Sequence, residues 1–527
     1  MGENHYDEAS RVRSSSRYAL SMIRKLLNDA FSSVVVPFVK ICITFIMAPV
    51  IVHSLGNYDY GVWEIVFAII GYMEFLDFGL MPAIVRNVAR FRALKDSEEM
   101  QRIYSSSLAF FFPVGVLLAG GLLAFSLWAP EVFVKGPDPG SHKYEIFFLI
   151  ISAQVFFVFV GGVFDCCLEG LMLYNLRNYT TVVFSIVGAV IMYPLLKNGG
   201  GLLVLAAVNA GGMSLKYLFY GLVLSWKKYG SFRFGVRYVS RQTFKGLFNF
   251  GVKSFVWALS LRISILTDPL VIGGFLGAAA VPFYMIPSNL VGQARNVVWS
   301  ITRVFLPVFS GLDALDEKEK TRNLYFGASR FMIGLVIPLL GGICLLGPSF
   351  IEHWMGFEYG EKGRWILYIL SAAYLLQWLN PFCRRFLTAI NKHEILARVG
   401  IISALVNLGL SLTLVRFIGK EGVALGTLLP VMMFEPYFLY KTCQELQCSM
   451  AQYAWHVFLP LLIPTAFFVL SLQGAMMLIH INSLIDVALL AMLSMGVYIP
   501  IFAVTAMKRE ERRKIYVRIR EKVFSGT

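Results

Sequence analysis

Apolar runs of about twenty residues recur along this chain from Phe31 to Met507, and they constrain its fold more than any other feature. Each run is long enough to cross the hydrocarbon core of a membrane, which is about 30 Å thick. The composition agrees, because 57% of the 527 residues are hydrophobic and only 15% are charged, whereas about a quarter are charged in a typical soluble domain. The sequence therefore predicts an all-α, multi-pass membrane protein and argues against a soluble enzyme.

We predict about fourteen membrane-spanning helices, whose boundaries follow the apolar runs. They cover residues 31–53, 62–85, 104–128, 144–170, 180–196, 202–225, 248–272, 281–309, 326–351, 364–388, 398–416, 422–445, 455–479 and 484–507. Cytoplasmic loops carry an excess of Lys and Arg, and this excess sets the orientation of a membrane protein. With the N-terminus in the cytoplasm, only seven of the 47 Lys and Arg residues fall in outside segments, namely Lys135, Lys143, Lys197, Lys362, Arg364, Arg416 and Lys420. This segregation predicts two cytoplasmic termini. The net charge of +15 lies in short clusters between spans, which is typical of loops on one membrane face and not of nucleic-acid binding.

The chain also resembles itself at a constant shift of 221 residues. The matches pair Leu55-Gly56 with Leu276-Gly277, Gly120-Gly121 with Gly341-Gly342, Glu131 with Glu352, Gly188 with Gly409 and Gly201 with Gly422. Six predicted spans separate the copies, so the two halves have the same orientation, as in transporters built from parallel repeats. Two such six-helix lobes can enclose a central cavity and give alternating access by rocking. The predicted domains are a cytoplasmic N-terminal segment (1–30), an N-lobe (31–225), a basic cytoplasmic linker (226–247), a C-lobe (248–445), two further spans (446–507) and a basic cytoplasmic tail (508–527).

Charged residues inside the predicted spans are the candidate functional residues, because a charge at mid-membrane costs about 3 kcal/mol and needs a partner or a wet cavity. We interpret the basic ones as substrate-binding groups for an anionic cargo: Lys40, Lys253, Arg262, Arg295 and Arg303. Arg binds phosphate through two parallel hydrogen bonds, and Lys binds it as a point charge. Lys253 and Arg303 could instead only extend toward the membrane interface.

The acidic residues inside the spans admit two interpretations. They are Glu74, Asp77, Asp268 and Glu435. They could couple transport to a cation, or they could pair internally with basic residues, as Glu74 with Arg295. For Glu435 the sequence suggests no obvious partner. The basic cavity expected from Arg262 and Arg295 favours an anionic cargo, and both interpretations of the acidic residues stay open.

Motifs around the first two spans of each half carry a family resemblance. In the first half they are Leu55-Gly56-x-x-x-Tyr60-Gly61-Val62-Trp63, Gly71-Tyr72, Leu76-Asp77-Phe78-Gly79-Leu80 and Arg86-x-x-Ala89. In the second half they are Asn249-Phe250-Gly251, Asp268 with Ile272-Gly273 and Phe275-Leu276-Gly277, Val281 to Tyr284, and His353-Trp354-Met355-Gly356. Over most of the chain this pattern of glycines and aromatic residues resembles the polysaccharide (O-antigen) flippases, the Wzx-like branch of the MATE-related superfamily.

The resemblance implies two lobes of six helices around a cavity, with the last two helices outside the repeat, in the inner (cytoplasmic) membrane of a bacterial-type cell. The implied cargo is an oligosaccharide linked to an anionic isoprenoid phosphate or pyrophosphate, and the implied partners are this lipid-linked oligosaccharide, membrane lipids and other polysaccharide-assembly proteins. In the similar lipid II flippases, arginines line the cavity, whereas the first helix here carries Lys40. We therefore expect the protein to flip lipid-linked oligosaccharide by alternating access, without a cofactor or metal.

Three alternatives compete with this interpretation. A MATE-type cation-coupled exporter of small organic molecules shares the superfamily fold, and the acidic pair Glu74 and Asp77 would suit it. A membrane enzyme would need a sizeable outward loop, but no D-x-D, nucleotide-binding loop or H-E-x-x-H motif occurs. A scaffold without transport remains open, although buried charge at symmetric positions is an expensive feature for a scaffold.

Overall fold

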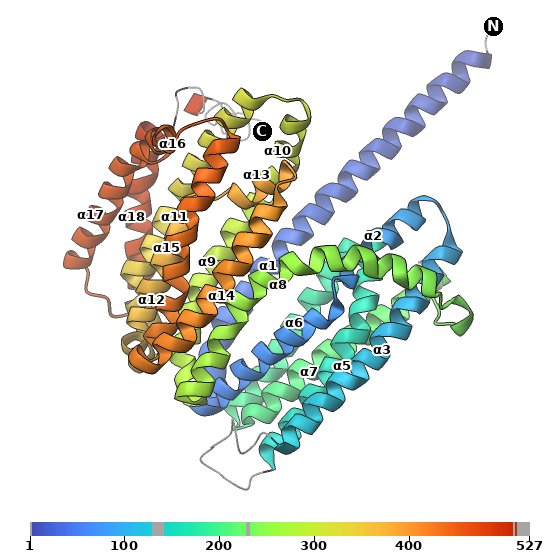
Figure 1. The fold of residues 1–527 in the computed structure, drawn as a ribbon, viewed down its shortest axis with the longest axis horizontal. Coiled ribbons are helices and arrows are strands. Elements are labelled where there is room, and N and C mark those ends of the chain that lie inside the picture. The colour runs from blue at the N-terminus through green and yellow to red at the C-terminus, as the bar shows by residue number, and fades with distance from the viewer. Residues whose placement is uncertain (1–2, 129–141, 228–231, 508, 510–511, 514–527) are drawn as a thin grey trace. The chain divides into compact units, whose positions relative to one another are not determined.

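The chain is seen here in a computed structural model that describes all residues except 1–2, 129–141, 228–231, 508, 510–511 and 514–527 (Figure 1). The side chains of residues 1–35, 37 and 250–265 are outside the description as well. Most of the described residues lie in helices, which confirms the predicted all-α class. Eleven helices among the described residues are long and apolar enough to cross a membrane, so the chain is a multi-pass membrane protein.

Two compact units make up the chain. The first comprises Met1–Tyr60 and Ile69–Val256, and the second comprises Gly61–Ala68 and Trp257–Thr527. The first unit contains, in chain order, most of α1 (Glu3–Met73), η1 (Glu74–Asp77), α2 (Leu80–Ala93), α3 (Ser97–Trp128), α5 (Lys143–Gly170), α6 (Tyr174–Lys197), α7 (Gly201–Ser225), η3 (Val236–Tyr238) and the first part of α8 (Arg241–Leu276).

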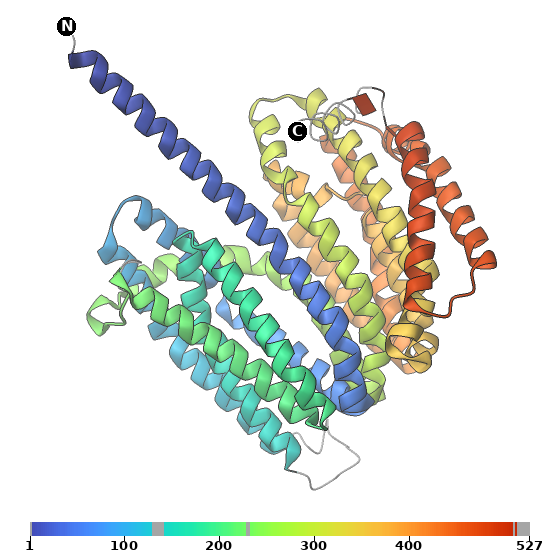
Figure 2. The same ribbon diagram turned by 180° about the vertical axis from the view of Figure 1, so that it is seen from behind.

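The central helix of the first unit is α5, which packs against α2, α3, α6 and α7. Its sequence is apolar on all sides, as expected of a helix that other helices surround. The close approach of α5 and α7 depends on Gly161, because a Cβ atom there would lie 2.2 Å from the ring of Tyr217. Figure 1 shows α3, α5 and α7 side by side, and Figure 2 shows the same helices from behind.

The second unit contains the remaining helices. They are the last part of α8, η4 (Ala278–Ala280), α9 (Val281–Thr302), α10 (Phe305–Ala314), α11 (Lys318–Met355), α12 (Phe357–Gln377), α13 (Cys383–Ala389), α14 (His393–Ile418), α15 (Lys420–Glu445), α16 (Met450–Val457), α17 (Leu459–Leu478) and α18 (Leu484–Thr505). Its central helix is α12, which packs against α9, α11 and α15, while α14 packs against α15.

The two units repeat the same packing at the shift of 221 residues. This shift places α3, α5 and α7 onto the ranges of α11, α12 and α15. In the first unit α5 contacts α3 and α7, and in the second unit α12 contacts α11 and α15. The backbone repeats as well, because Gly56 (φ 71°, ψ 174°) corresponds to Gly277 (φ 86°, ψ 159°). Lys95 and Asp316, which also have positive φ, form a second such pair.

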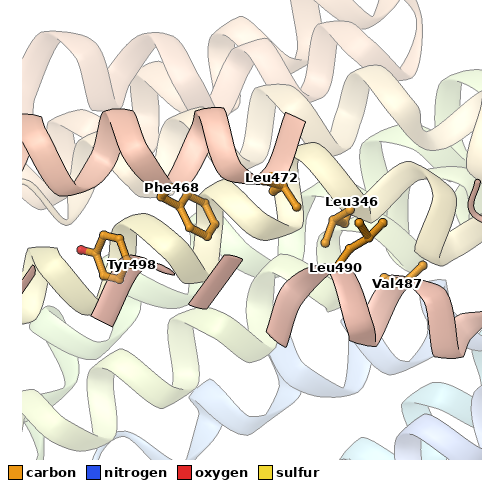
Figure 3. Packing of buried hydrophobic residues seen from close by; sticks show 6 residues of the cluster. All are labelled: Leu346, Phe468, Leu472, Val487, Leu490 and Tyr498. Atoms are coloured by element: carbon orange, nitrogen blue, oxygen red, sulfur yellow. The ribbon is translucent and has the colours of Figure 1, made fainter. Parts of the chain in front are cut away.

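The last two helices pack against α11 of the second unit. Side chains of α11, α17 and α18 form the buried cluster of Leu346, Phe468, Leu472, Val487, Leu490 and Tyr498 (Figure 3). The hydroxyl of Tyr498 donates a hydrogen bond of 2.6 Å to the carbonyl oxygen of Gly334. A Cβ atom on Gly334 would lie 2.1 Å from the ring of Phe502, so α18 can approach α11 this closely only at a glycine.

The predicted number of fourteen spans is not confirmed. Within α1, the backbone is not helical at Gly56, which separates two helical segments. Predicted span 31–53 lies on the first segment, and predicted span 62–85 lies on the second segment, η1 and the start of α2. Predicted span 248–272 lies on α8, whose side chains are described only in part. Predicted span 364–388 lies on α12 and α13, and α12 is not among the eleven apolar helices because its first turns carry charged residues, namely Glu358, Glu361, Lys362 and Arg364. The tail predicted at 508–527 lies almost wholly outside the described residues.

Candidate functional site

A polar pocket lies inside the second unit, where α9, α12, α13, α14 and α15 come together. Its cavity volume is about 140 Å³. Charged, amide and aromatic side chains line it, among them Arg295, Trp299, Tyr374, Arg384, Asn407 and Glu435. We call it the α9–α15 pocket.

A break between two helices positions one of the pocket's charges. Helix α12 ends at Gln377, and α13 begins at Cys383. Pro381 lies in this break, and proline cannot donate the backbone hydrogen bond that would continue a helix. The first turn of α13 carries Arg384, which lines the pocket.

Arg295 on α9 is held by aromatic side chains. Its Nη1 atom donates a hydrogen bond of 2.8 Å to the hydroxyl of Tyr374 on α12. Its guanidinium carbon lies 5.4 Å from the centroid of the Tyr374 ring and 5.5 Å from that of Trp299. A guanidinium at such distances from aromatic rings is attracted to their faces. These contacts hold the guanidinium of Arg295 at the pocket wall.

Arg384 and Glu435 form an ion pair across the pocket. The Nη2 atom of Arg384 lies 2.7 Å from Oε1 of Glu435, and their side chains are 30% and 9% exposed. The sequence suggested no obvious partner for Glu435. The structure gives both residues an oppositely charged neighbour, which a buried charge requires.

Three buried atoms at the pocket wall have no hydrogen-bond partner among the residues that the structure describes. They are Nε of Arg295, Oδ1 of Asn407 and Oε2 of Glu435. The amide nitrogen of Asn407 is used, because it donates to the carbonyl oxygen of Gly426 (2.9 Å) and to Oγ1 of Thr427 (3.1 Å). One donor and two acceptors thus remain for a molecule inside the pocket.

Asp268 lies beside this pocket in the same unit. It is only 7% exposed, and Oδ2 accepts a hydrogen bond of 2.5 Å from the hydroxyl of Tyr284. The same hydroxyl lies within hydrogen-bonding reach of Thr427, which lines the pocket. Asp268 is thus connected to the pocket through Tyr284 and Thr427, and its described partner is a tyrosine and not a basic residue.

The remaining predicted site residues whose side chains are described do not line the α9–α15 pocket. Arg303 is exposed at the end of α9, near Arg385. In the first unit Lys40 and Glu74 are exposed, and Asp77 accepts a hydrogen bond of 2.7 Å from the backbone N–H of Gly79. This last contact fixes the turn before α2. Arg262 and Lys253 are residues whose side chains lie outside the described part of the chain.

Sequence reasoning missed a charged cluster in the first unit. Arg177 contacts both oxygens of Asp165 at 2.7 Å and Oε2 of Glu169 at 2.8 Å. A signal was present, because carboxylates four residues apart lie on one face of a helix. For Arg384 and Glu435 no local spacing could have revealed the pair, since 51 residues separate them.

The chain matches a known protein family and relatives with descriptive names. Residues 26–313 match the family described as "Polysaccharide biosynthesis protein". The chain is 22% identical over 377 residues to a protein of Shigella flexneri named "Putative O-antigen transporter", and this match covers 71% of the chain and 87% of that protein.

Two solved structures have the same fold. The structure titled "Lipid II flippase MurJ, inward closed conformation" matches with a TM-score of 0.70 at 15% identity, over 92% of this chain and 98% of that one. An inward-facing multidrug resistance MATE family transporter of the MOP superfamily matches with a TM-score of 0.62 at 17% identity, over 76% and 94%. At these identities the likeness concerns the fold, and it confirms the predicted MATE-like architecture.

Proposed function

Because this chain belongs to the polysaccharide biosynthesis protein family, we propose that it flips a lipid-linked oligosaccharide across the membrane. The cargo is a repeat unit linked to an isoprenoid phosphate or pyrophosphate, and it moves from the cytoplasmic to the outer leaflet for assembly of a surface polysaccharide. The observation that carries this proposal is the family match over residues 26–313 in a chain of membrane-spanning helices. The name of the Shigella flexneri relative, an O-antigen transporter, supports the same cargo class.

The chemistry of the described residues is compatible with a polar glycan cargo. Arg295 presents a guanidinium next to aromatic rings, and such a pair suits a substrate with sugar and phosphate groups. We propose that transport proceeds by alternating access. Lys40, Lys253, Arg262, Arg295 and Arg303 remain proposed cargo-binding residues, while Asp268 and Glu435 act in internal pairing.

We also propose the location of the protein and its interaction partners. It resides in the inner (cytoplasmic) membrane with both termini in the cytoplasm, as the distribution of Lys and Arg indicates. It acts as a transporter and not as a catalyst. Its partners are the anionic lipid-linked oligosaccharide, membrane lipids and other polysaccharide-assembly proteins.

Deletion of the gene in its host tests the proposal. The surface glycan and the isoprenoid-linked sugars of the inner membrane are measured together. Loss of surface glycan, with lipid-linked repeat units still facing the cytoplasm, is the expected result. An intact surface glycan with altered sensitivity to small cationic compounds would overturn it in favour of a MATE-type exporter.

A further inference from the structure

We propose that the α9–α15 pocket binds one sugar ring of the glycan through the ring's hydroxyl groups. The inference rests on the proposed function, because it names the part of the proposed cargo that the second unit binds. It assigns a recognition role to Asn407, Glu435 and Trp299, and it makes the pocket a specificity site for the sugar.

The partnerless atoms at the pocket wall point to hydroxyl groups. Oδ1 of Asn407 and Oε2 of Glu435 can only accept hydrogen bonds, and Nε of Arg295 can only donate one. Asn407 and Glu435 are 3% and 8% exposed, so these atoms have little access to bulk water. A hydroxyl both donates and accepts, and a sugar ring carries several of them at fixed spacing. A single ring can therefore satisfy donors and acceptors on different walls of the same pocket.

The charge balance of the pocket disfavours a phosphate. Arg384 is already neutralised by Glu435 at 2.7 Å, so it is not available for bidentate binding of an anion. The free oxygen of the Glu435 carboxylate lines the same space and would repel a phosphate oxygen. Among the described residues, Arg295 contacts no carboxylate, and its Nη1 atom is bound to the hydroxyl of Tyr374. The pocket thus suits a neutral polyol better than an anionic group.

Size and aromatic lining fit one six-membered ring. The pocket volume is about 140 Å³, and a cavity of about 150 Å³ holds one benzene molecule. Trp299, Tyr374 and Phe434 supply apolar surface for the C–H face of a pyranose ring. Aromatic walls with a few convergent polar groups are the usual composition of a small-molecule site.

Saturation-transfer NMR on the purified full chain in lipid nanodiscs tests the inference. The probes are methyl glycosides of glucose, galactose, N-acetylglucosamine and glucuronic acid, with inorganic phosphate as the competitor. We compare the wild type with Glu435→Gln, which replaces the partnerless acceptor by a donor at constant shape, and with Trp299→Leu. The matched control is Glu445→Gln on the same helix, whose carboxylate pairs with Lys392 at 2.5 Å outside this pocket. Thermal unfolding of every variant checks that it is folded.

We expect at least one of the three uncharged glycosides to bind the wild type and the control, to bind both pocket variants about tenfold more weakly, and to resist competition by phosphate. Absence of binding by all four glycosides, binding of the glucuronide alone, equal binding in every variant, or displacement by phosphate would each overturn the inference. The gene deletion separates the two proposals. If deletion abolishes surface glycan while no glycoside binds, the flippase proposal stands and the pocket holds only solvent.

Discussion

Arg295 is a predicted cargo-binding residue that lines the α9–α15 pocket. Its side chain lies between the rings of Trp299 and Tyr374 and lines the α9–α15 pocket. A hydrogen bond to a charged group contributes about 1.5–3 kcal/mol, and about 1.4 kcal/mol corresponds to a tenfold change in binding. We therefore expect Arg295→Ala to reduce glycan export by about tenfold or more, while the protein stays in the membrane.

The Arg295→Lys variant is the matched comparison for this prediction. It keeps the positive charge but loses the planar guanidinium that donates to Tyr374, so we expect partial export. Surface glycan is quantified per copy of protein in the membrane fraction. Full export by Arg295→Ala would remove the residue from the transport mechanism. Loss of both variants from the membrane would instead assign it a structural role.

The Arg384–Glu435 pair gives a prediction about stability. Glu435→Leu leaves the guanidinium of Arg384 without its carboxylate in a half-buried place, and the loss of a charged partner costs about 1–3 kcal/mol. The double variant Arg384→Met, Glu435→Leu should recover most of this loss, because no unpaired charge remains. Thermal unfolding of the wild type, the single variant and the double variant in nanodiscs measures these differences in stability.

A more exposed ion pair in the same unit provides the control. Lys392 and Glu445 are 46% and 21% exposed, and exposed pairs contribute about 1 kcal/mol or less. Glu445→Leu should therefore lower the unfolding temperature less than Glu435→Leu does. If both single variants unfold alike, or if the double variant is no more stable than Glu435→Leu, the pair is not the source of stability.

At the residue scale, the sequence predicts which charges matter but not what they contact. Arg295 and Asp268 stand out because a charge in an apolar run is expensive. Their neighbours Tyr374 and Tyr284 lie on other helices, and nothing in the sequence marks either tyrosine as the partner of these charges. The partner of Glu435 depends on the break between α12 and α13, which brings Arg384 to α15. Contacts of this kind follow from helix packing and not from local spacing.

At the scale of elements, the glycine turn at Gly277 gives a clean test of backbone strain. Its φ of 86° with ψ of 159° is a region that is nearly restricted to glycine, and a side chain there costs about 1–3 kcal/mol. No atom lies within 4 Å of a Cβ built on Gly277, so the cost comes from the backbone alone. We expect Gly277→Ala to lower the unfolding temperature and the folded yield.

The neighbouring glycine Gly274 is the control for this substitution. It lies in helix α8, and a Cβ there also meets no atom within 4 Å. Alanine favours a helix over glycine by about 1 kcal/mol, so Gly274→Ala should leave stability unchanged or raise it. Equal behaviour of the two variants would show that the turn at Gly277 is not strained by a side chain. Gly56→Ala should behave like Gly277→Ala, since the two turns correspond in the repeat.

Helices are the element that the sequence predicts best here, because a run of about twenty apolar residues has one stable form in a membrane. Their ends are less well predicted. The chain continues through the non-helical Gly56 with no loop between the two helical segments of α1. Pro381 lies between α12 and α13, which together cover one predicted span. Whether a glycine or proline only bends a helix or ends it depends on the neighbours that satisfy the freed backbone groups.

At the scale of the whole molecule, the internal repeat links sequence to architecture. The shift of 221 residues relates helix packing in the two units and the positive-φ residues Gly56 and Gly277. The charged residues do not follow it, since the Arg384–Glu435 pair and the pocket around it have no such counterpart among the ion pairs described in the first unit. The two units thus share their helix packing but differ in their polar residues. The internal repeat in the sequence could therefore predict the fold but not the position of the pocket.

The orientation in the membrane can be tested with reporter fusions. The distribution of Lys and Arg predicts both termini and the turn at Asn391 in the cytoplasm, and the turn at Gly199 outside. Alkaline phosphatase needs disulfides, which form only outside the cytoplasm, whereas green fluorescent protein fluoresces when fused on the cytoplasmic side. We expect phosphatase activity from a fusion at Gly199, and fluorescence without phosphatase activity from fusions at Asn391 and at the C-terminus.

Each fusion site tests a different part of the orientation. Gly199 joins α6 to α7, and Asn391 joins α13 to α14, so the two sites report on the two units separately. An active phosphatase at Asn391 together with an inactive one at Gly199 would show that the whole molecule has the opposite orientation in the membrane. Inversion of one site alone would place both turns on the same face, so an even number of spans would separate them instead of the predicted odd number, and the parallel relation between the repeats would be broken. In a flippase, the parallel orientation of the two units lets both open to the same leaflet at the same time. If the two units were not parallel, alternating access would no longer be the mechanism.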